Sequence, residues 1–74
     1  MERGERMGDI LKISLASARV NANLTQEEVC KVLNISKKTL GSWENGNSEP
    51  KISQALDLAE LYHCNVNNIA FARA

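Results

Sequence analysis

The stretch Leu24–Pro50, LTQEEVCKVLNISKKTLGSWENGNSEP, contains the signals for two short helices separated by a tight break. Thr25 and Glu28 have the spacing of a capping box, in which each residue caps the other at the start of a helix. Asn34 is expected to end this helix, and Ser36 is expected to cap the next one. Two short helices joined in this way indicate a helix-turn-helix.

The second helix of the pair is expected over residues 37–45 and ends at Gly46, because glycine adopts a positive φ freely. Leu40 and Trp43 lie three residues apart and therefore share the buried face. The opposite face is the one that a helix-turn-helix directs toward the DNA major groove, so DNA binding is the first functional hypothesis. The residues of this face are Lys37, Lys38, Gly41, Ser42 and Asn45.

Three further helices are expected, and together they predict an all-α fold of five helices. The first is expected over residues 9–21, with its first residue, an aspartate, as the N-cap. The fourth is expected over residues 52–62, and the last is a short helix that Asn65 caps. We expect residues 9–74 to form a single domain after a flexible N-terminal arm of residues 1–8. The core residues expected on the second and fourth helices are Val29, Val32, Leu33, Ile52, Ala55, Leu56, Ala59 and Tyr62.

The bulk composition restricts the class of protein. A chain of 74 residues that is 43% hydrophobic suits one small globular domain. No apolar run approaches the roughly 20 residues that cross a bilayer, and the charged start does not fit a signal peptide, so a cytoplasmic protein without membrane contact is expected. The formal net charge of zero argues against strong non-specific binding of nucleic acid. Residues 31–51, however, contain four lysines and two acidic residues, which predicts a locally positive face.

Cysteine usage and the remaining reactive residues indicate neither a metal site nor an enzyme. Cys30 and Cys64 are the only cysteines, and Cys30 falls in the apolar phase of its helix, as a buried free thiol would. His63 adds a third potential ligand without the paired spacing of zinc sites. Because no acid–base or nucleophilic constellation is visible, no catalysis, cofactor or small-molecule ligand is expected.

Together these residues resemble the phage repressor and Cro family of helix-turn-helix domains, over about residues 10–70. The resemblance implies a lambda-repressor-like fold, in which the second and third of five helices form the DNA-binding unit. The chain departs from the family at Cys30, where alanine is usual, and at Asn34 and His63, where glycine is usual. Asparagine and histidine tolerate the left-handed conformation that glycine would adopt there. The matching residues are Arg19, Leu24 to Glu28, Ile35, Ser36, Trp43 to Gly46, Pro50 and the run from Leu56 to Ile69.

The predicted DNA contacts form two sets. Lys37 and Lys38 stand at the N-terminal end of the recognition helix (residues 37–45), where the helix dipole disfavours positive charge, so their position indicates a role beyond helix stability. Gln26 contacts a phosphate by resemblance, and the backbone N–H groups beside it also favour an anion. Base contacts are expected from Lys37, Lys38, Gly41 and Ser42. Phosphate contacts are expected from Gln26, Ser36, Thr39, Asn45 and Asn47.

The sequence leaves open an alternative for several of these residues. The two lysines also fit an ordinary solvated face, and Gln26 also fits an exposed helix start. Asn45 and Asn47 are common turn residues. Gly41 costs about 1 kcal/mol of helix stability relative to alanine. Its missing side chain either admits the backbone closer to the groove or removes a contact.

Two further residues gain a structural role from the resemblance. It implies an ion pair between Arg19 and Glu44 that ties the first helix to the recognition helix, and the alternative for Arg19 is a phosphate contact. Trp43 shares the face of Leu40, so we expect it in the core and not as a platform for stacking bases.

The sequence favours a sequence-specific DNA-binding transcriptional regulator, either a phage-like repressor or a small controller protein. Because one recognition helix reads only a few base pairs, a homodimer on a palindromic operator in double-stranded DNA is expected. Val66, Ile69 and Phe71 are the predicted interface, unless Phe71 packs back on the first helix and closes the core. The competing function is an antitoxin-like or adaptor protein that uses the same fold for protein–protein contact.

Overall fold

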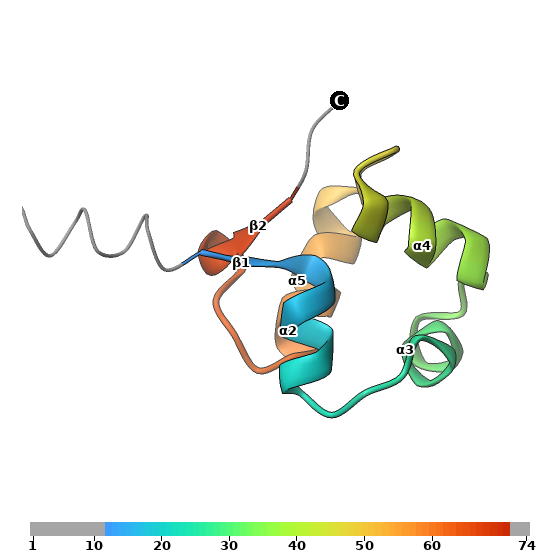
Figure 1. Ribbon diagram of the computed structural model, residues 1–74, viewed down its shortest axis with the longest axis horizontal. Helices are drawn as coiled ribbons and strands as arrows, with labels where there is room; N and C mark the ends of the chain where they lie inside the picture. Colours follow the sequence, from blue (N-terminus) through green and yellow to red (C-terminus); the bar gives the residue numbers. More distant parts are fainter. Residues whose placement is uncertain (1–11, 72–74) are drawn as a thin grey trace, which may run out of the picture.

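The computed structural model of the chain describes residues 12–71. These residues form four α-helices, one 3-10 helix and two short strands (Figure 1). In Figure 1, α3 and α4 meet at a tight turn on one side of the molecule, and α5 passes behind α2. In chain order the elements are β1 (Ile13–Ser14), α2 (Leu15–Asn21), α3 (Gln26–Leu33), α4 (Lys37–Asn45), α5 (Ile52–Leu61), η1 (Val66–Asn68) and β2 (Ile69–Ala70).

The caps predicted for the helix-turn-helix are confirmed. The Thr25 hydroxyl accepts a hydrogen bond from the Glu28 backbone N–H at 3.1 Å, and the Glu28 carboxylate accepts one from the Thr25 backbone N–H at 2.8 Å. The Ser36 hydroxyl caps α4 by accepting from the Thr39 backbone N–H at 3.0 Å. Asn34 and Gly46 end α3 and α4 in the left-handed conformation, with φ of 58° and 82°. These local hydrogen bonds satisfy backbone groups that helix ends leave unpaired, and they fix the turn between α3 and α4.

The expected first helix begins later than predicted. Residues Ile13 and Ser14 are extended, and α2 begins at Leu15 with Ser14 as its N-cap. The Ser14 hydroxyl accepts from the Ser17 backbone N–H at 3.0 Å, which satisfies the first turn of α2. The predicted cap, Asp9, and the arm of residues 1–8 lie outside the described residues.

The prediction of a last α-helix after Asn65 is wrong. Asn65 does cap a helical turn, but η1 is a 3-10 helix of three residues, and the chain then extends into β2. β2 pairs with β1 in parallel, with Ile13 opposite Ile69. The segment is too short to repay the nucleation of another α-helix, whereas pairing with β1 buries Ile69 to 3% exposure. The described residues are thus mostly helical with a small parallel sheet, and they do not form five α-helices.

The core lies where α2, α3, α4 and α5 converge. Leu40 and Trp43 of α4 are buried in it, as predicted from their spacing. Both anchor α4 in the domain, on the side of the helix that faces away from the exposed Lys38. The buried hydrophobic residues are Leu15, Ala18, Val29, Cys30, Leu40, Trp43, Leu58, Ala59, Tyr62 and Ile69.

Three apolar residues expected in the core point toward solvent. Val32 on α3 is 62% exposed, and Ile52 and Leu56 on α5 are 80% and 50% exposed. The orientation of α5 is set by Leu58, which is fully buried, and by Ala59 and Tyr62, which are also buried. The prediction for α5 was therefore wrong at Ile52 and Leu56, because this helix has more apolar positions than its buried face can hold, whereas Ala59 and Tyr62 are buried as predicted.

Candidate nucleic-acid interface

The N-terminal end of α4 is positively charged and accessible. Lys37 and Lys38 are both exposed, and no described residue pairs with the Lys38 side chain. Lys37 Nζ lies 3.2 Å from Glu27 Oε2 in an exposed ion pair, which is weak and readily exchanged for another anion. A hydrogen bond to the backbone and the neighbouring Lys37 both lower the pKa of Glu27, so this carboxylate stays ionised at neutral pH.

The middle of the exposed face of α4 has little side-chain bulk. A Cβ atom added at Gly41 would meet no other group within 4 Å, so packing within the described residues does not require glycine there. The Ser42 and Ser48 hydroxyl oxygens lie 2.7 Å apart, which connects α4 to the loop that follows it. Gly41 and Ser42 therefore leave room for a ligand to approach the α4 backbone.

Some of the polar groups predicted to contact phosphate are already hydrogen-bonded within the protein, and others are free. The Ser36 hydroxyl donates to Thr39 Oγ1 at 3.0 Å and accepts from the Thr39 backbone N–H, so both of its roles are used within α4. Thr39 keeps its own hydroxyl proton for another acceptor. Among the described residues, neither the Asn45 nor the Asn47 side-chain amide has a hydrogen-bond partner.

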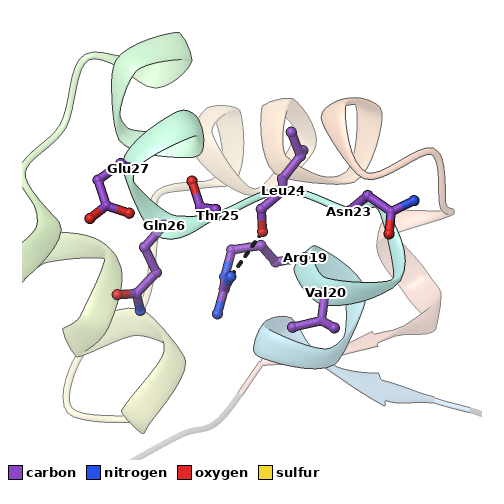
Figure 2. A pocket seen from close by; sticks show the side chains of 7 residues that line it. All are labelled: Arg19, Val20, Asn23, Leu24, Thr25, Gln26 and Glu27. Atoms are coloured by element: carbon purple, nitrogen blue, oxygen red, sulfur yellow. Dashed lines mark hydrogen bonds between the residues drawn. The ribbon is translucent and has the colours of Figure 1, made fainter.

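Gln26 lies at the rim of a shallow hollow between the end of α2 and the start of α3 (Figure 2). The hollow has a volume of about 470 Å³. Gln26 Nε2 donates to Glu44 Oε1 at 2.9 Å, which uses one of its two N–H groups and leaves the other available. The residues that line the hollow are Arg19, Val20, Asn23, Leu24, Thr25, Gln26 and Glu27.

Arg19 and Glu44 are the centre of a polar network that joins three helices. Arg19 Nε lies 2.8 Å from Glu44 Oε2, and the two side chains are only 15% and 6% exposed. Arg19 Nη1 also donates to the Leu24 carbonyl oxygen at 2.9 Å, the bond drawn in Figure 2. Because Gln26 binds the second oxygen of Glu44, the network holds α2, the start of α3 and α4 in one arrangement. Sequence reasoning missed the link between Gln26 and Glu44, since no local pattern connects residues on different helices.

Comparison with protein families agrees with this geometry. The family model described as helix-turn-helix matches residues 15–68, which is most of the chain. The chain belongs to the helix-turn-helix family. This family membership supports a DNA-binding function for the α3–α4 unit. No curated protein and no solved structure matched the chain.

Behind the polar network of this helix-turn-helix domain lies a buried phenol. Tyr62 is in the core, and its hydroxyl has no hydrogen-bond partner among residues 12–71. Burial, and to a lesser degree the negative charge of Glu44, raises the pKa of Tyr62 to about 12. Nothing in the sequence indicated that this hydroxyl would be left without a partner.

We expect the titration of Tyr62 to report this environment. It is the only tyrosine of the chain, so the ultraviolet absorbance of phenolate measures it alone. The folded protein should ionise near pH 12, whereas urea-unfolded protein should ionise near 10.0. Since the folded state holds the proton more tightly, Tyr62 stabilises the fold fully below pH 10 and loses that contribution as the pH rises toward 12. A midpoint near 10 in protein that is still helical would contradict the burial of this hydroxyl.

The residues predicted to form a dimer interface are mostly covered within the helix-turn-helix domain. Ile69 is in the core, while Val66 and Phe71 are partly buried and pack against it.

Among residues 12–71, no group of three histidine, cysteine or acidic side chains could hold a metal ion, and both cysteines are free. Within the same range, every helix is too short or too polar to cross a membrane.

Proposed function

We propose that this helix-turn-helix protein is a cytoplasmic, sequence-specific DNA-binding transcriptional regulator, either a phage-like repressor or a small controller protein. The observation that carries the proposal is the exposed N-terminal end of α4, with two lysines on a helix anchored by Leu40, Trp43 and the Arg19–Glu44 pair. In a bound complex this end enters the major groove. Base contacts are assigned to Lys37, Lys38, Gly41 and Ser42.

The phosphate contacts that we propose surround this end of α4. The free side-chain N–H of Gln26, together with the positive end of the α3 dipole, suits one phosphate. The Thr39 hydroxyl and the free amides of Asn45 and Asn47 suit others, while Ser36 contributes by holding Thr39 in place. Most of these donors are neutral, which accounts for DNA binding by a protein with a formal net charge of zero.

Operator selectivity with a moderate salt dependence is the expected result of a direct binding test. A gel-shift titration would use the DNA upstream of the protein's own gene and a scrambled duplex of equal composition. Each phosphate that a lysine neutralises contributes about −0.9 to the slope of the logarithm of the binding constant against the logarithm of salt concentration, and the two lysines set a limit of about −2 per copy. Equal affinity for both duplexes would contradict sequence-specific regulation. Absence of binding to any duplex would favour the antitoxin-like or adaptor function.

A further inference from the structure

One of the two lysines at the start of α4 is tethered to α3, whereas the other is free. Lys37 Nζ lies 3.2 Å from Glu27 Oε2, which joins the first residue of α4 to the second residue of α3. The two side chains remain 57% and 69% exposed. Lys38, the next residue of α4, has no partner among residues 12–71. The pair therefore spans the two helix ends that we propose to face DNA, and it restrains one long side chain there.

Stability of the fold does not account for this tether. Exposed ion pairs contribute little to the free energy of unfolding, because water screens both charges. A backbone hydrogen bond and the neighbouring Lys37 hold the pKa of Glu27 below its usual value, so the carboxylate is charged at neutral pH. Glu27 also lines the hollow beside Gln26 (Figure 2), and its charge there repels phosphates. The tether therefore lowers the general attraction to DNA and changes where Lys37 can bind.

We propose that Glu27 is a positioning residue, which restrains the Lys37 ammonium group for contact with bases and keeps it from the phosphates. The inference rests on the proposed function, because it gives Glu27 a role only in a complex with DNA. An ammonium group has three N–H donors, and Glu27 uses one of them. The other two are free to bind acceptors such as guanine O6 and N7. Because DNA displaces water from this surface, the tether is stronger in the complex than in the free protein.

The tether affects operator and non-operator DNA differently. An untethered lysine has a flexible four-carbon side chain and reaches phosphates on any duplex, which raises affinity without reading sequence. A tethered Lys37 adds little to non-operator complexes and keeps two donors for an operator that offers base acceptors. Its side chain is also partly ordered before binding, so less conformational entropy is lost when it contacts a base. Glu27 therefore increases the ratio of operator affinity to non-operator affinity.

The neighbouring acidic residue provides a matched control. Glu28 follows Glu27 in the first turn of α3, but its carboxylate accepts the Thr25 backbone N–H at 2.8 Å instead of holding a lysine. A glutamine at this position keeps an oxygen for the cap, since either residue type completes a capping box. Glu28→Gln therefore removes the same charge from the same helix end and leaves Lys37 tethered.

The experiment measures the affinity of the full chain for the DNA upstream of its own gene and for a scrambled duplex, at several salt concentrations. Glu27→Gln should lower the ratio of the two affinities about fivefold or more, within the discrimination that one base contact supplies. The salt slope on the scrambled duplex should become steeper by about 0.9, because the released Lys37 neutralises one more phosphate. Glu28→Gln should raise both affinities by one factor and leave the ratio and the slope unchanged. Circular dichroism checks that both variants fold.

A second substitution tests whether the effect passes through Lys37. In a Lys37→Gln background, Glu27→Gln should change both affinities by the same factor as Glu28→Gln, because no lysine is left to release. An equal change of the two affinities in Glu27→Gln, a higher ratio in that variant, or the same loss of ratio without Lys37 would overturn the proposal. Failure of the proposed function gives a different result, because the wild type itself would then show no preference for the upstream DNA, and Glu27 would have no base-reading lysine to position.

Discussion

Glu44→Ala should destabilise the protein by about 3–5 kcal/mol, the usual loss when one partner of a buried ion pair is removed. The Glu44 side chain is only 6% exposed and accepts hydrogen bonds from both Arg19 and Gln26. Its removal leaves a mostly buried guanidinium without a carboxylate and an amide without its acceptor. Since small domains have a total stability of about 5–15 kcal/mol, the midpoint of urea unfolding should fall sharply.

The chain offers a matched control and a test of coupling for this prediction. Glu27→Ala removes the carboxylate of the exposed pair with Lys37 and should leave the midpoint of urea unfolding almost unchanged. Arg19→Ala should destabilise by an amount similar to Glu44→Ala, and the double variant should lose less than the sum of the two. Glu44→Gln, which keeps an acceptor for Gln26, provides a folded variant if the alanine variant does not fold. Additive losses would show that the two residues do not stabilise each other.

The helix-turn-helix was predictable because its signals are local. The capping box of Thr25 and Glu28, the Ser36 cap and the left-handed Asn34 each depend on residues within one helical turn. Such short-range hydrogen bonds form in the same way whatever the rest of the chain does. The sequence therefore located α3 and α4 correctly, and the buried faces of Leu40 and Trp43 with them.

The ends of the domain were not predictable from local signals. Residues 65–71 have a helix cap and apolar residues at helical spacing, but Ile69 gains more by pairing with Ile13, far away in the sequence. The prediction of buried Ile52 and Leu56 failed for a related reason, because both faces of α5 carry aliphatic residues and only packing selects between them. In the candidate interface, the sequence identified polar residues that suit DNA contacts. It could not identify the hydrogen bond from Gln26 to Glu44, because that bond depends on how two helices meet.

Lys38→Ala is expected to weaken operator binding by about 1–3 kcal/mol, roughly 5- to 150-fold, and to relax the preference at one base pair. Lys38 is exposed at the end of α4 that we propose to enter the groove, and no described residue competes for its ammonium group. A lysine in this position donates to the acceptors that guanine presents in the major groove. The measurement is a gel-shift titration against the operator and single-base variants of it.

Two measurements distinguish a base contact of Lys38 from a phosphate contact: the ranking of the operator variants by affinity, and the dependence of affinity on salt. Lys31→Ala removes the same charge from the exposed side of α3, so it controls for long-range electrostatic attraction and should weaken all duplexes slightly and equally. If Lys38 contacts a base, its replacement changes the ranking of the operator variants. If it contacts only a phosphate, all duplexes weaken by one factor and the salt slope falls by about 0.9. That second outcome would leave sequence reading to Lys37, Gly41 and Ser42, the other base contacts that we propose.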